Sequence, residues 1–285
     1  MIQDKLKKIN DHSPVIEQRK VSGGDINHAY YVRTDENEYF VKANVNVPSS
    51  FFEVEAFGLD TVRQTNTIDV PNVYYYDTDP NQTMYLIMEW IEGEKNTNTD
   101  EQLGRNLAAM HLAESAGSYG LDRHSFVGTL LQENQWYRSW SDYYREKRLL
   151  PQLEIGKERG YMSTKRLKNL EKLIERLDDF IPKQPPASLL HGDLWAGNWM
   201  VGPRGIPYLI DPSIVYGDPI FELAMTELFG GFSPIFYRAY QELLPLPDDY
   251  EDRKPIYQLF YLLVHLNLFG ETYGPSVDRI LKRYV

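Results

Sequence analysis

The chain of 285 residues contains no cysteine. Disulfide bonds, thiolate metal sites and thiol catalysis are therefore excluded, and the sequence tolerates a reducing compartment. It also lacks any run of about 18 apolar residues, the length that a membrane-spanning helix needs. Residues 1–10 lack the apolar stretch of a signal peptide. We therefore expect a cytoplasmic protein with no membrane partner.

An excess of positive charge is also missing. The formal net charge is −11 at pH 7, which repels polyanions such as nucleic acids. In the basic stretch 165–176, lysine and arginine are interleaved with Glu and Leu at helical spacing, which is typical of a solvated helix face. We therefore expect no nucleic-acid partner. A bound nucleotide would need a local cation, a glycine-rich turn or a metal for its phosphates.

The first third of the chain has the pattern of short strands interrupted by one helix. Two strand-like segments, 30–32 and 39–42, flank a polar turn and predict a hairpin. Ser50 and Glu53 have the spacing of a capping box, and the apolar residues that follow them at helical spacing predict a helix. The further strands expected in this part are 71–76 and 84–88.

Beyond Gly93 helical periodicity dominates. The segments that show it are 100–114, 135–149, 164–180 and much of 221–244. Their one clear interruption is 189–211, where short apolar segments lead into polar residues. We therefore expect an α+β fold with a small antiparallel sheet lobe at 1–91, which contains one key helix, and a larger, mainly helical lobe at 92–285.

Residues 191–198 and the strand that follows them carry three oxygen-bearing side chains. Asp193 and Asn198 are separated by four residues, and Asp211 follows an apolar segment. Phosphoryl transfer to an alcohol needs a carboxylate to accept the hydroxyl proton, and oxygen ligands to hold magnesium across the phosphates. We predict Asp193 as the base and Asn198 and Asp211 as the metal ligands. The alternative for this segment alone is a turn in which Asp193 caps a helix.

A lysine and a glutamate in the first part complete this pattern. Lys42 ends an apolar strand, and a kinase uses such a lysine to hold the α- and β-phosphates of ATP while a helix glutamate orients it. Glu55 is the predicted partner, because Glu53 already has a role in the capping box. Gly23 and Gly24 precede the first hairpin, where backbone N–H groups could cover phosphates.

The connector between the two parts consists of Met88, Glu89, Trp90 and Ile91. In a kinase this connector is the hinge that presents backbone groups to adenine. The order of glycine turn, lysine, helix glutamate, connector, Asp-x4-Asn and final Asp resembles the two-lobed protein-kinase-like fold. This resemblance implies ATP and Mg²⁺ as cofactors.

The acceptor is expected to be a small molecule. The interval from Asp211 to Gly217 is too short for a long activation loop, and the sequence Ala-Pro-Glu is absent. The chain resembles the fructosamine kinase (ketosamine-3-kinase) family in four strings: 191–198 (HGDLWAGN), 210–218 (IDPSIVYGD), 222–225 (ELAM) and 229–232 (FGGF). The resemblance spans nearly the whole chain. It implies phosphorylation of the sugar 3-hydroxyl of small or protein-bound ketoamines.

Four residues are candidates for contact with this acceptor. Trp195 lies two residues beyond the predicted base, and the C–H face of a sugar packs well on an indole; burial in the core is the alternative. Trp136 lies in a further string that resembles the family. Asp218 and Glu222 are expected to orient the catalytic loop or to meet the protonated nitrogen of the ketoamine, or else to serve a helix dipole.

Two other functions remain open at this point. An aminoglycoside or choline-type phosphotransferase would share every predicted catalytic residue and differ in its acceptor pocket. A non-catalytic nucleotide-binding module would keep the fold without the chemistry. The preferred sugar, the carrier amine and the oligomeric state are left open by the sequence.

Overall fold

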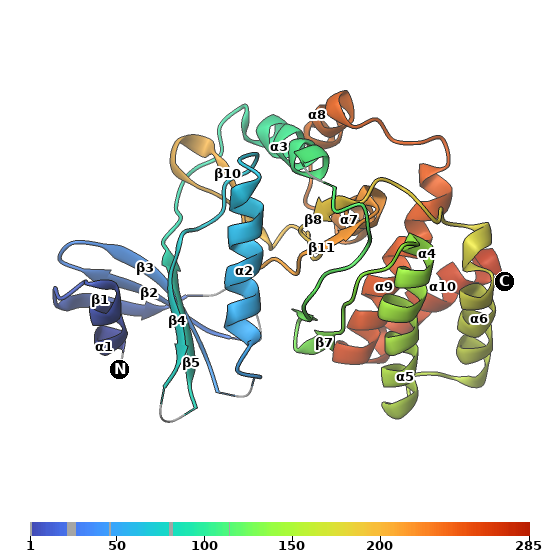
Figure 1. The fold of residues 1–285 in the computed structure, drawn as a ribbon, viewed down its shortest axis with the longest axis horizontal. Helices are drawn as coiled ribbons and strands as arrows, with labels where there is room; N and C mark the ends of the chain where they lie inside the picture. Colours follow the sequence, from blue (N-terminus) through green and yellow to red (C-terminus); the bar gives the residue numbers. More distant parts are fainter. Residues whose placement is uncertain (1, 22–26, 46, 80–81, 114) are drawn as a thin grey trace.

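The computed structural model describes residues 2–21, 27–45, 47–79, 82–113 and 115–285. It confirms the α+β class. Figure 1 shows a sheet with one long helix in the blue and cyan part of the chain, beside a larger group of helices in green to red. Strand β5 ends at Glu89 and helix α3 begins at Thr99, so the connector predicted at 88–91 lies where the sheet gives way to helices.

The N-terminal part is a five-stranded antiparallel sheet with the strand order β1-β2-β3-β5-β4. Its strands are β1 Val15–Lys20, β2 His28–Thr34, β3 Glu38–Asn44, β4 Val73–Thr78 and β5 Met84–Glu89. The predicted hairpin is confirmed as the β2–β3 pair. Alternation along β3 places Val41 in a small core with Leu6 of α1 (Ile2–Leu6), so the next residue, Lys42, lies on the opposite face.

Helix α2 (Phe51–Gln64) confirms the predicted helix, but the predicted capping box is wrong. Ser50 has φ −82° and ψ −3°, and its side chain makes no capping hydrogen bond. An N-cap side chain reaches the amides of the first turn from an extended conformation, whereas Ser50 is already helical. Glu53 is exposed. Glu55 is buried on the apolar face of the helix together with Phe52 and Leu59.

The C-terminal part is mainly helical, as predicted. Its helices are α3 Thr99–Ala113, α4 Trp140–Tyr144, α5 Leu150–Glu158, α6 Thr164–Glu175, α7 Pro219–Leu228, α8 Pro234–Leu243, α9 Tyr250–Phe269 and α10 Gly274–Tyr284. The helix predicted at 135–149 begins later, at Trp140, because Ser139 caps it by accepting a hydrogen bond from the amide of Asp142. It continues through a π-helical turn, 145–149, into α5.

Three short strand pairs interrupt these helices. They are β6 Ser125–Val127 with β7 Leu130–Gln132, β8 Ser188–Leu190 with β11 Val215–Gly217, and β9 Trp199–Val201 with β10 Pro207–Leu209. Strand β8 leads directly into His191, and β10 ends two residues before Asp211. The β8–β11 and β9–β10 pairs therefore bring the ends of the predicted catalytic segments together.

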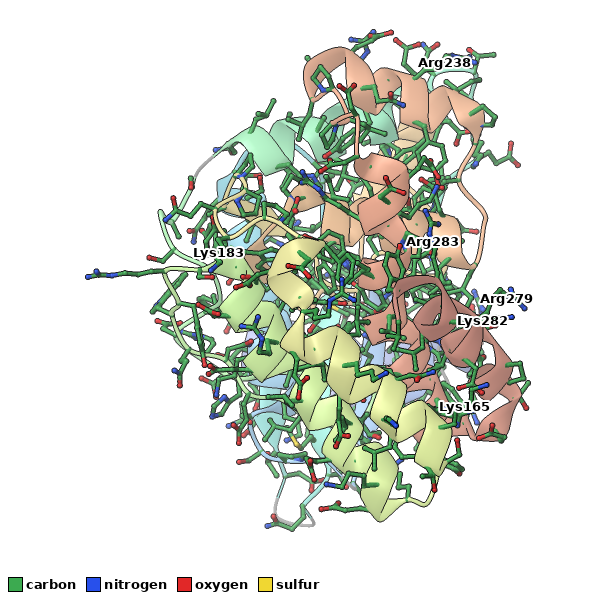
Figure 2. The ribbon with its side chains drawn as sticks, turned by 90° about the vertical axis from the view of Figure 1, so that its right-hand side faces the viewer. Lys165, Lys183, Arg238, Arg279, Lys282 and Arg283 are labelled. Atoms are coloured by element: carbon green, nitrogen blue, oxygen red, sulfur yellow. The ribbon has the colours of Figure 1, made fainter. Side chains whose placement is uncertain are left out.

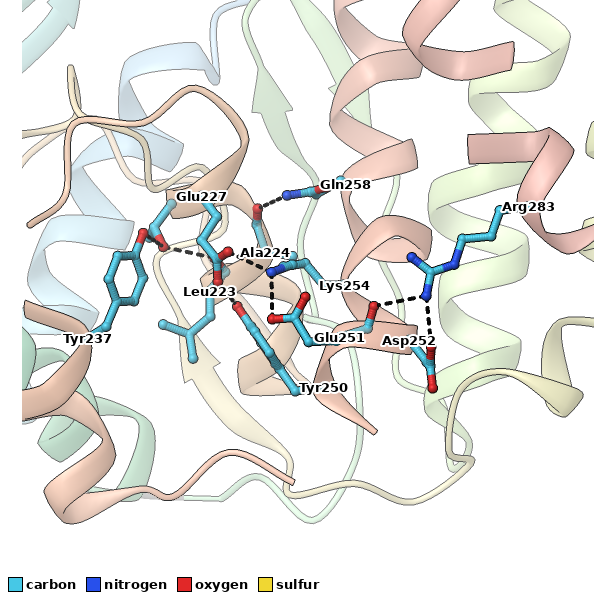
Figure 3. A network of polar contacts seen from close by, with 11 residues as sticks. Leu223, Ala224, Glu227, Tyr237, Tyr250, Glu251, Asp252, Lys254, Gln258 and Arg283 are labelled. Atoms are coloured by element: carbon cyan, nitrogen blue, oxygen red, sulfur yellow. Dashed lines mark hydrogen bonds and ion pairs between the residues drawn. The ribbon is translucent and has the colours of Figure 1, made fainter. Parts of the chain in front are cut away.

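A polar network fixes α7 against α9 (Figure 3). Glu227 of α7 accepts hydrogen bonds from Tyr250 and from Lys254 of α9, the latter at 2.7 Å. Gln258 donates to the carbonyl of Ala224 at 3.0 Å. Because α7 also carries Glu222, these contacts set the position of a carboxylate that lies beneath the catalytic loop.

Basic side chains are spread over several exposed elements rather than gathered in one groove. Figure 2 shows Lys165 on α6 near Arg279 and Lys282 on α10, with Lys183 and Arg238 farther away. Helix α6 buries Leu170 and Leu173, which agrees with the amphipathic pattern of 165–176. Among the described residues, no helix has the length and apolar character needed to cross a membrane.

Candidate active site

Three predicted residues meet at the ammonium group of Lys42. Its Nζ atom lies 2.7 Å from Oε1 of Glu55 and 2.5 Å from Oδ1 of Asp211. Burial alone would lower the pKa of Lys42, but the charges of Asp211 and Glu55 outweigh it and raise that pKa above its ordinary value. Lys42 therefore stays a cation and joins strand β3, helix α2 and the segment after β10.

Asp193 and Asn198 lie together on the loop between β8 and β9. The amide nitrogen of the Asn198 side chain donates to the backbone carbonyl of Asp193 at 2.7 Å and to its carboxylate Oδ2 at 3.2 Å. The backbone carbonyl of Asn198 accepts from the amide of Ile210 at 3.0 Å. The next residue is Asp211, so one hydrogen-bonded unit carries all three oxygen-bearing side chains.

The environment of Asp193 changes its acidity. Burial and the nearby carboxylate of Asp211 raise the pKa of Asp193 to about 8, against the hydrogen bond from Asn198, which lowers it. A carboxylate whose pKa lies near neutral pH is a stronger proton acceptor than an exposed aspartate. The raised pKa therefore suits Asp193 to the role of general base.

The imidazole of His191 ties the catalytic loop to the segment before Asp211. Its Nε2 atom lies 2.8 Å from the carbonyl of Ile210, and its Nδ1 atom lies 3.3 Å from the amide of Asp193. A carbonyl can only accept and an amide can only donate, so Nε2 carries the proton and Nδ1 does not. Burial lowers the pKa of His191, which favours this neutral form.

Gly192 is required by the backbone at this position. Its φ is +84°, and a Cβ atom would lie 2.0 Å from the carbonyl oxygen of Ser213. Any larger residue would force the loop away from the segment that follows Asp211. The glycine therefore allows the two catalytic segments to approach each other.

Glu222 and Asp218 require a correction. Both carboxylates are buried, with 0% and 1% of their surface exposed, so neither meets a substrate amine in this structure. Glu222 accepts hydrogen bonds from the backbone amides of His191 at 3.1 Å and Gly192 at 2.6 Å. Asp218 caps α7 at the amide of Ile220 and accepts from Tyr257. Glu222 thus holds the catalytic loop, the alternative left open by the sequence.

His111 is a partner of Glu222 that the sequence did not reveal, and Tyr240 is in turn a partner of His111. The Nε2 atom of His111 lies 2.8 Å from Oε2 of Glu222, and its Nδ1 atom lies 2.7 Å from the hydroxyl of Tyr240. Burial would raise the pKa of Glu222, but the hydrogen bond from His111 lowers it below its ordinary value. Glu222 is therefore an ionised acceptor. The apolar spacing around His111 predicts only a core position.

Part of the connector already has backbone partners in the sheet and cannot offer those groups to adenine. The amide of Glu89 already donates to the carbonyl of Asn72 at 2.8 Å, and Met88 pairs with Phe40 of β3 and Val73 of β4, whereas β5 ends before Trp90. The ring centroid of Trp90 lies 4.8 Å from that of Tyr31. Trp90 and Ile91 therefore remain the residues from which we expect backbone contact with adenine.

The remaining predicted residues lie at the surface or outside the described chain. Trp195 and Trp136 are 41% and 43% exposed, so the core interpretation of Trp195 is wrong. The ring of Trp136 lies 5.8 Å from that of Tyr216. Gly23 and Gly24 fall outside the described residues.

The donors present fit magnesium held together with a nucleotide. The described residues contain no group of three His, Cys, Asp or Glu side chains that could hold a metal alone. Magnesium in kinase sites needs only one or two protein ligands, because phosphates and water complete its octahedron. The carboxylate of Asp211 and the amide oxygen of Asn198 are hard donors of this kind.

A cavity of about 480 Å³ lies away from this chemistry. It is lined by residues of the α2–β4 loop, by Glu89 and by Tyr208. Neither Asp193 nor Lys42 lines it. The chemistry therefore places the candidate site at the Lys42, Asp193 and Asp211 cluster and not at this cavity.

Comparison with known proteins agrees with the geometry. A family model described as fructosamine kinase matches residues 1–285. This chain belongs to the fructosamine kinase family. It is 38% identical over 265 residues to a probable ketoamine kinase of Enterococcus faecium, covering 93% of this chain and 94% of that protein. It is 34% identical to the chloroplastic protein-ribulosamine 3-kinase of Arabidopsis thaliana, covering 93% of this chain and 81% of that protein.

Solved structures show the same fold. A putative fructosamine-3-kinase from Haemophilus somnus superposes with a TM-score of 0.88 at 26% identity, covering 99% of this chain and 96% of that one. An aminoglycoside phosphotransferase solved with ADP and hygromycin B gives a TM-score of 0.66 at 15% identity, covering 98% and 97%. The second likeness concerns the fold alone. The predictions of a kinase-like fold and of a kinase of the fructosamine kinase family are confirmed.

Proposed function

We propose that this fructosamine kinase family member transfers the γ-phosphoryl group of ATP to the 3-hydroxyl of the sugar moiety of a ketoamine. The observation that carries the proposal is the position of Asp193. The Asp193 carboxylate accepts a hydrogen bond from the side-chain amide of Asn198. It also lies close enough to Asp211 for the negative charge of Asp211 to raise the pKa of Asp193. This is the arrangement that transfer to a hydroxyl needs, with a base beside the metal ligands.

The described residues divide the work as follows. Asp193 orients the acceptor hydroxyl and accepts its proton. Lys42 holds the α- and β-phosphates, and Glu55 orients Lys42. Asn198 and Asp211 would hold magnesium, which when bound would neutralise charge on the transferring phosphates. Glu222 keeps the amides of the catalytic loop in place.

The acceptor side is proposed to use exposed indoles. Trp195 and Trp136 offer apolar faces at the surface, and such faces pack on the C–H groups of a sugar. The Arabidopsis relative is named as a protein-ribulosamine kinase, which supports ketoamines attached to proteins as substrates.

A 3-phosphate would make the ketoamine unstable. Tautomerisation of the carbon 2 carbonyl toward carbon 1 gives an enaminol, and its nitrogen lone pair can expel phosphate from carbon 3. Water then hydrolyses the resulting iminium, which releases the free amine and a deoxyosone. We therefore propose a repair role in which the enzyme performs one phosphorylation and the amine is freed without further catalysis.

Two measurements test the function. ATP consumption is compared for ribulosamine, erythrulosamine and fructosamine, with choline and kanamycin as acceptors that would indicate the other phosphotransferase classes. The ribulose- or fructose-modified lysine product is then filtered free of enzyme and followed over time. We expect free lysine and inorganic phosphate to appear together. Phosphorus NMR that places the phosphate on a terminal hydroxyl, or a product that stays intact, would contradict the repair role.

A further inference from the structure

The hairpin β6–β7 belongs to the helical part of the chain but packs against α2, the helix that carries Glu55. The ring centroids of Phe126 in β6 and Phe51 in α2 lie 4.9 Å apart. The guanidinium carbon of Arg123 lies 3.5 Å from the ring centroid of Phe57. Figure 1 shows the hairpin, labelled at β7, beside the N-terminal half of α2.

The same hairpin reaches the segment after Asp211. The side-chain amide of Gln132 donates to Oγ of Ser213 at 2.9 Å, and both residues are buried. Helix α2 touches this segment as well, because a Cβ atom on Gly58 would lie 3.0 Å from Cγ of Pro212. The hairpin, α2 and the residues after Asp211 therefore form one packed unit across the two parts of the chain.

The base of the hairpin is fixed to the helical part. The side-chain amide nitrogen of Asn134 donates to the carbonyl of Arg123 at 3.1 Å and to Oγ of Ser125 at 3.2 Å. Its oxygen accepts from the hydroxyl of Tyr143 at 2.6 Å and from Arg148 at 3.0 Å. Asn134 and its donors are buried, so the hairpin presents Phe126 to α2 from a rigid support.

A kinase site works only when its lysine–glutamate pair is formed, and kinases with a long activation loop use that loop to place the helix glutamate. The interval after Asp211 has no room for such a loop. We propose that the β6–β7 hairpin takes this role and that Phe126 is the positioning residue that keeps Glu55 of α2 beside Lys42. The inference rests on the proposed role of the Lys42–Glu55 pair in nucleotide binding.

The proposal predicts a separation of kinetic constants. Replacing Phe126 by Ala removes one aromatic pair and weakens the hold of the hairpin on α2. We expect the KM for ATP to rise about tenfold, in line with the loss of such a pair. The kcat should stay within about twofold, because saturating nucleotide selects the paired state. Phe126→Leu, which keeps apolar volume, should restore most of the affinity.

The matched control lies on the same hairpin. Thr129 lies in the turn between the two strands and is exposed, so Thr129→Ala should leave both constants unchanged. In a Glu55→Gln background, Phe126→Ala should add little to the KM for ATP, because each change disrupts the same Lys42–Glu55 pair. Fully additive losses, or an unchanged KM in Phe126→Ala, would overturn the proposal.

A measurement without nucleotide separates this inference from the proposed function. Amide hydrogen exchange in residues 51–56 should become faster in Phe126→Ala, or in Phe126→Val if the alanine variant does not fold, while exchange in α6 stays the same. Unchanged protection of 51–56 would contradict the positioning role. If the wild type does not turn over ATP with any acceptor, the proposed function fails, and the exchange data still decide whether the hairpin holds α2.

Discussion

The ammonium group of Lys42 is shared by two carboxylates from different parts of the chain, Glu55 at 2.7 Å and Asp211 at 2.5 Å. Lys42 and Glu55 are both buried. Removing one partner of a buried ion pair leaves a charge without compensation, which is more damaging than losing an exposed pair. The pair and Asp211 should therefore behave as one functional unit.

Mutation of this unit gives the first prediction. Lys42→Met removes the charge while a thioether fills similar space, and Glu55→Gln removes the charge that orients Lys42. We expect each variant to lose at least about tenfold in kcat/KM for ATP, and the double variant to lose much less than the product of the two. Glu53→Gln is the control, because Glu53 is exposed. Multiplicative losses would show that Glu55 is not the partner.

Asp193→Asn tests the base. Asparagine keeps the size of the side chain but cannot accept the acceptor's proton, and loss of a general base typically lowers the rate by about 10²–10⁴. Nucleotide affinity, measured by calorimetry, should stay close to that of the wild type. A near-normal kcat in a preparation free of contaminating kinase would remove Asp193 from the mechanism.

The pH dependence of the wild type follows from the same residue. Asp193 acts only when ionised, and its pKa is raised to about 8. The value of kcat/KM should therefore fall as the pH decreases below this range, whereas an ordinary aspartate with a pKa of about 3.9 would give no such decline above pH 5. Magnesium bound by Asp211 would oppose the charge that raises this pKa, so the limb should lie below pH 8 in the loaded enzyme. A flat profile from pH 5 to 9 would contradict this role.

Glu222→Gln tests the support of the catalytic loop. An amide cannot accept from His191, Gly192 and His111 at once, because its nitrogen would face a donor. We expect kcat to fall about tenfold or more with little change in the KM for ATP. Asp218→Asn is the control, since Asp218 binds Tyr257 and the α7 amide but not the loop. It should lower stability and leave kcat unchanged. Equal losses of kcat in both variants would argue against a specific role of Glu222.

The sequence predicted best those features of the site that depend on residues close together along the chain. Asp193, Asn198 and Asp211 lie on one loop and the following strand pair, so their spacing alone places them together. Glu222 meets this loop only because α7 packs beneath it, and that packing depends on contacts with α9 such as Lys254. Contacts between residues so far apart in the sequence cannot be predicted from local periodicity.

Other elements were missed for equally physical reasons. The capping box at Ser50 failed because the chain reaches α2 already in a helical conformation. Helix α9 is apolar around most of its circumference and contains Pro255, so it lacks the one-sided stripe by which a helix is recognised. The hairpin β6–β7 has strands too short for a clear alternation.

The last prediction concerns Asp11, a buried carboxylate at the N-terminal edge of the sheet. It accepts hydrogen bonds from Ser13, from Thr34 at 2.9 Å and from Tyr39 at 2.8 Å. Burial would raise the pKa of Asp11, but these hydrogen bonds outweigh it and hold the pKa below the ordinary value. The ionised form therefore stabilises the folded state above the unfolded pKa of about 3.9, and this contribution is lost as the pH falls through the folded pKa.

We expect Asp11→Asn to lower the free energy of unfolding by about 2 kcal/mol at pH 7, the scale of hydrogen bonds to a charged group. Urea unfolding at pH 7 and at pH 3 measures this. The control is Asp35→Asn, because Asp35 lies exposed in the β2–β3 turn. The difference between wild type and Asp11→Asn should narrow at pH 3, because the unfolded state then takes up a proton at Asp11 while the folded state still holds it ionised. A difference that is equal at both pH values would mean that the charge of Asp11 does not stabilise the sheet.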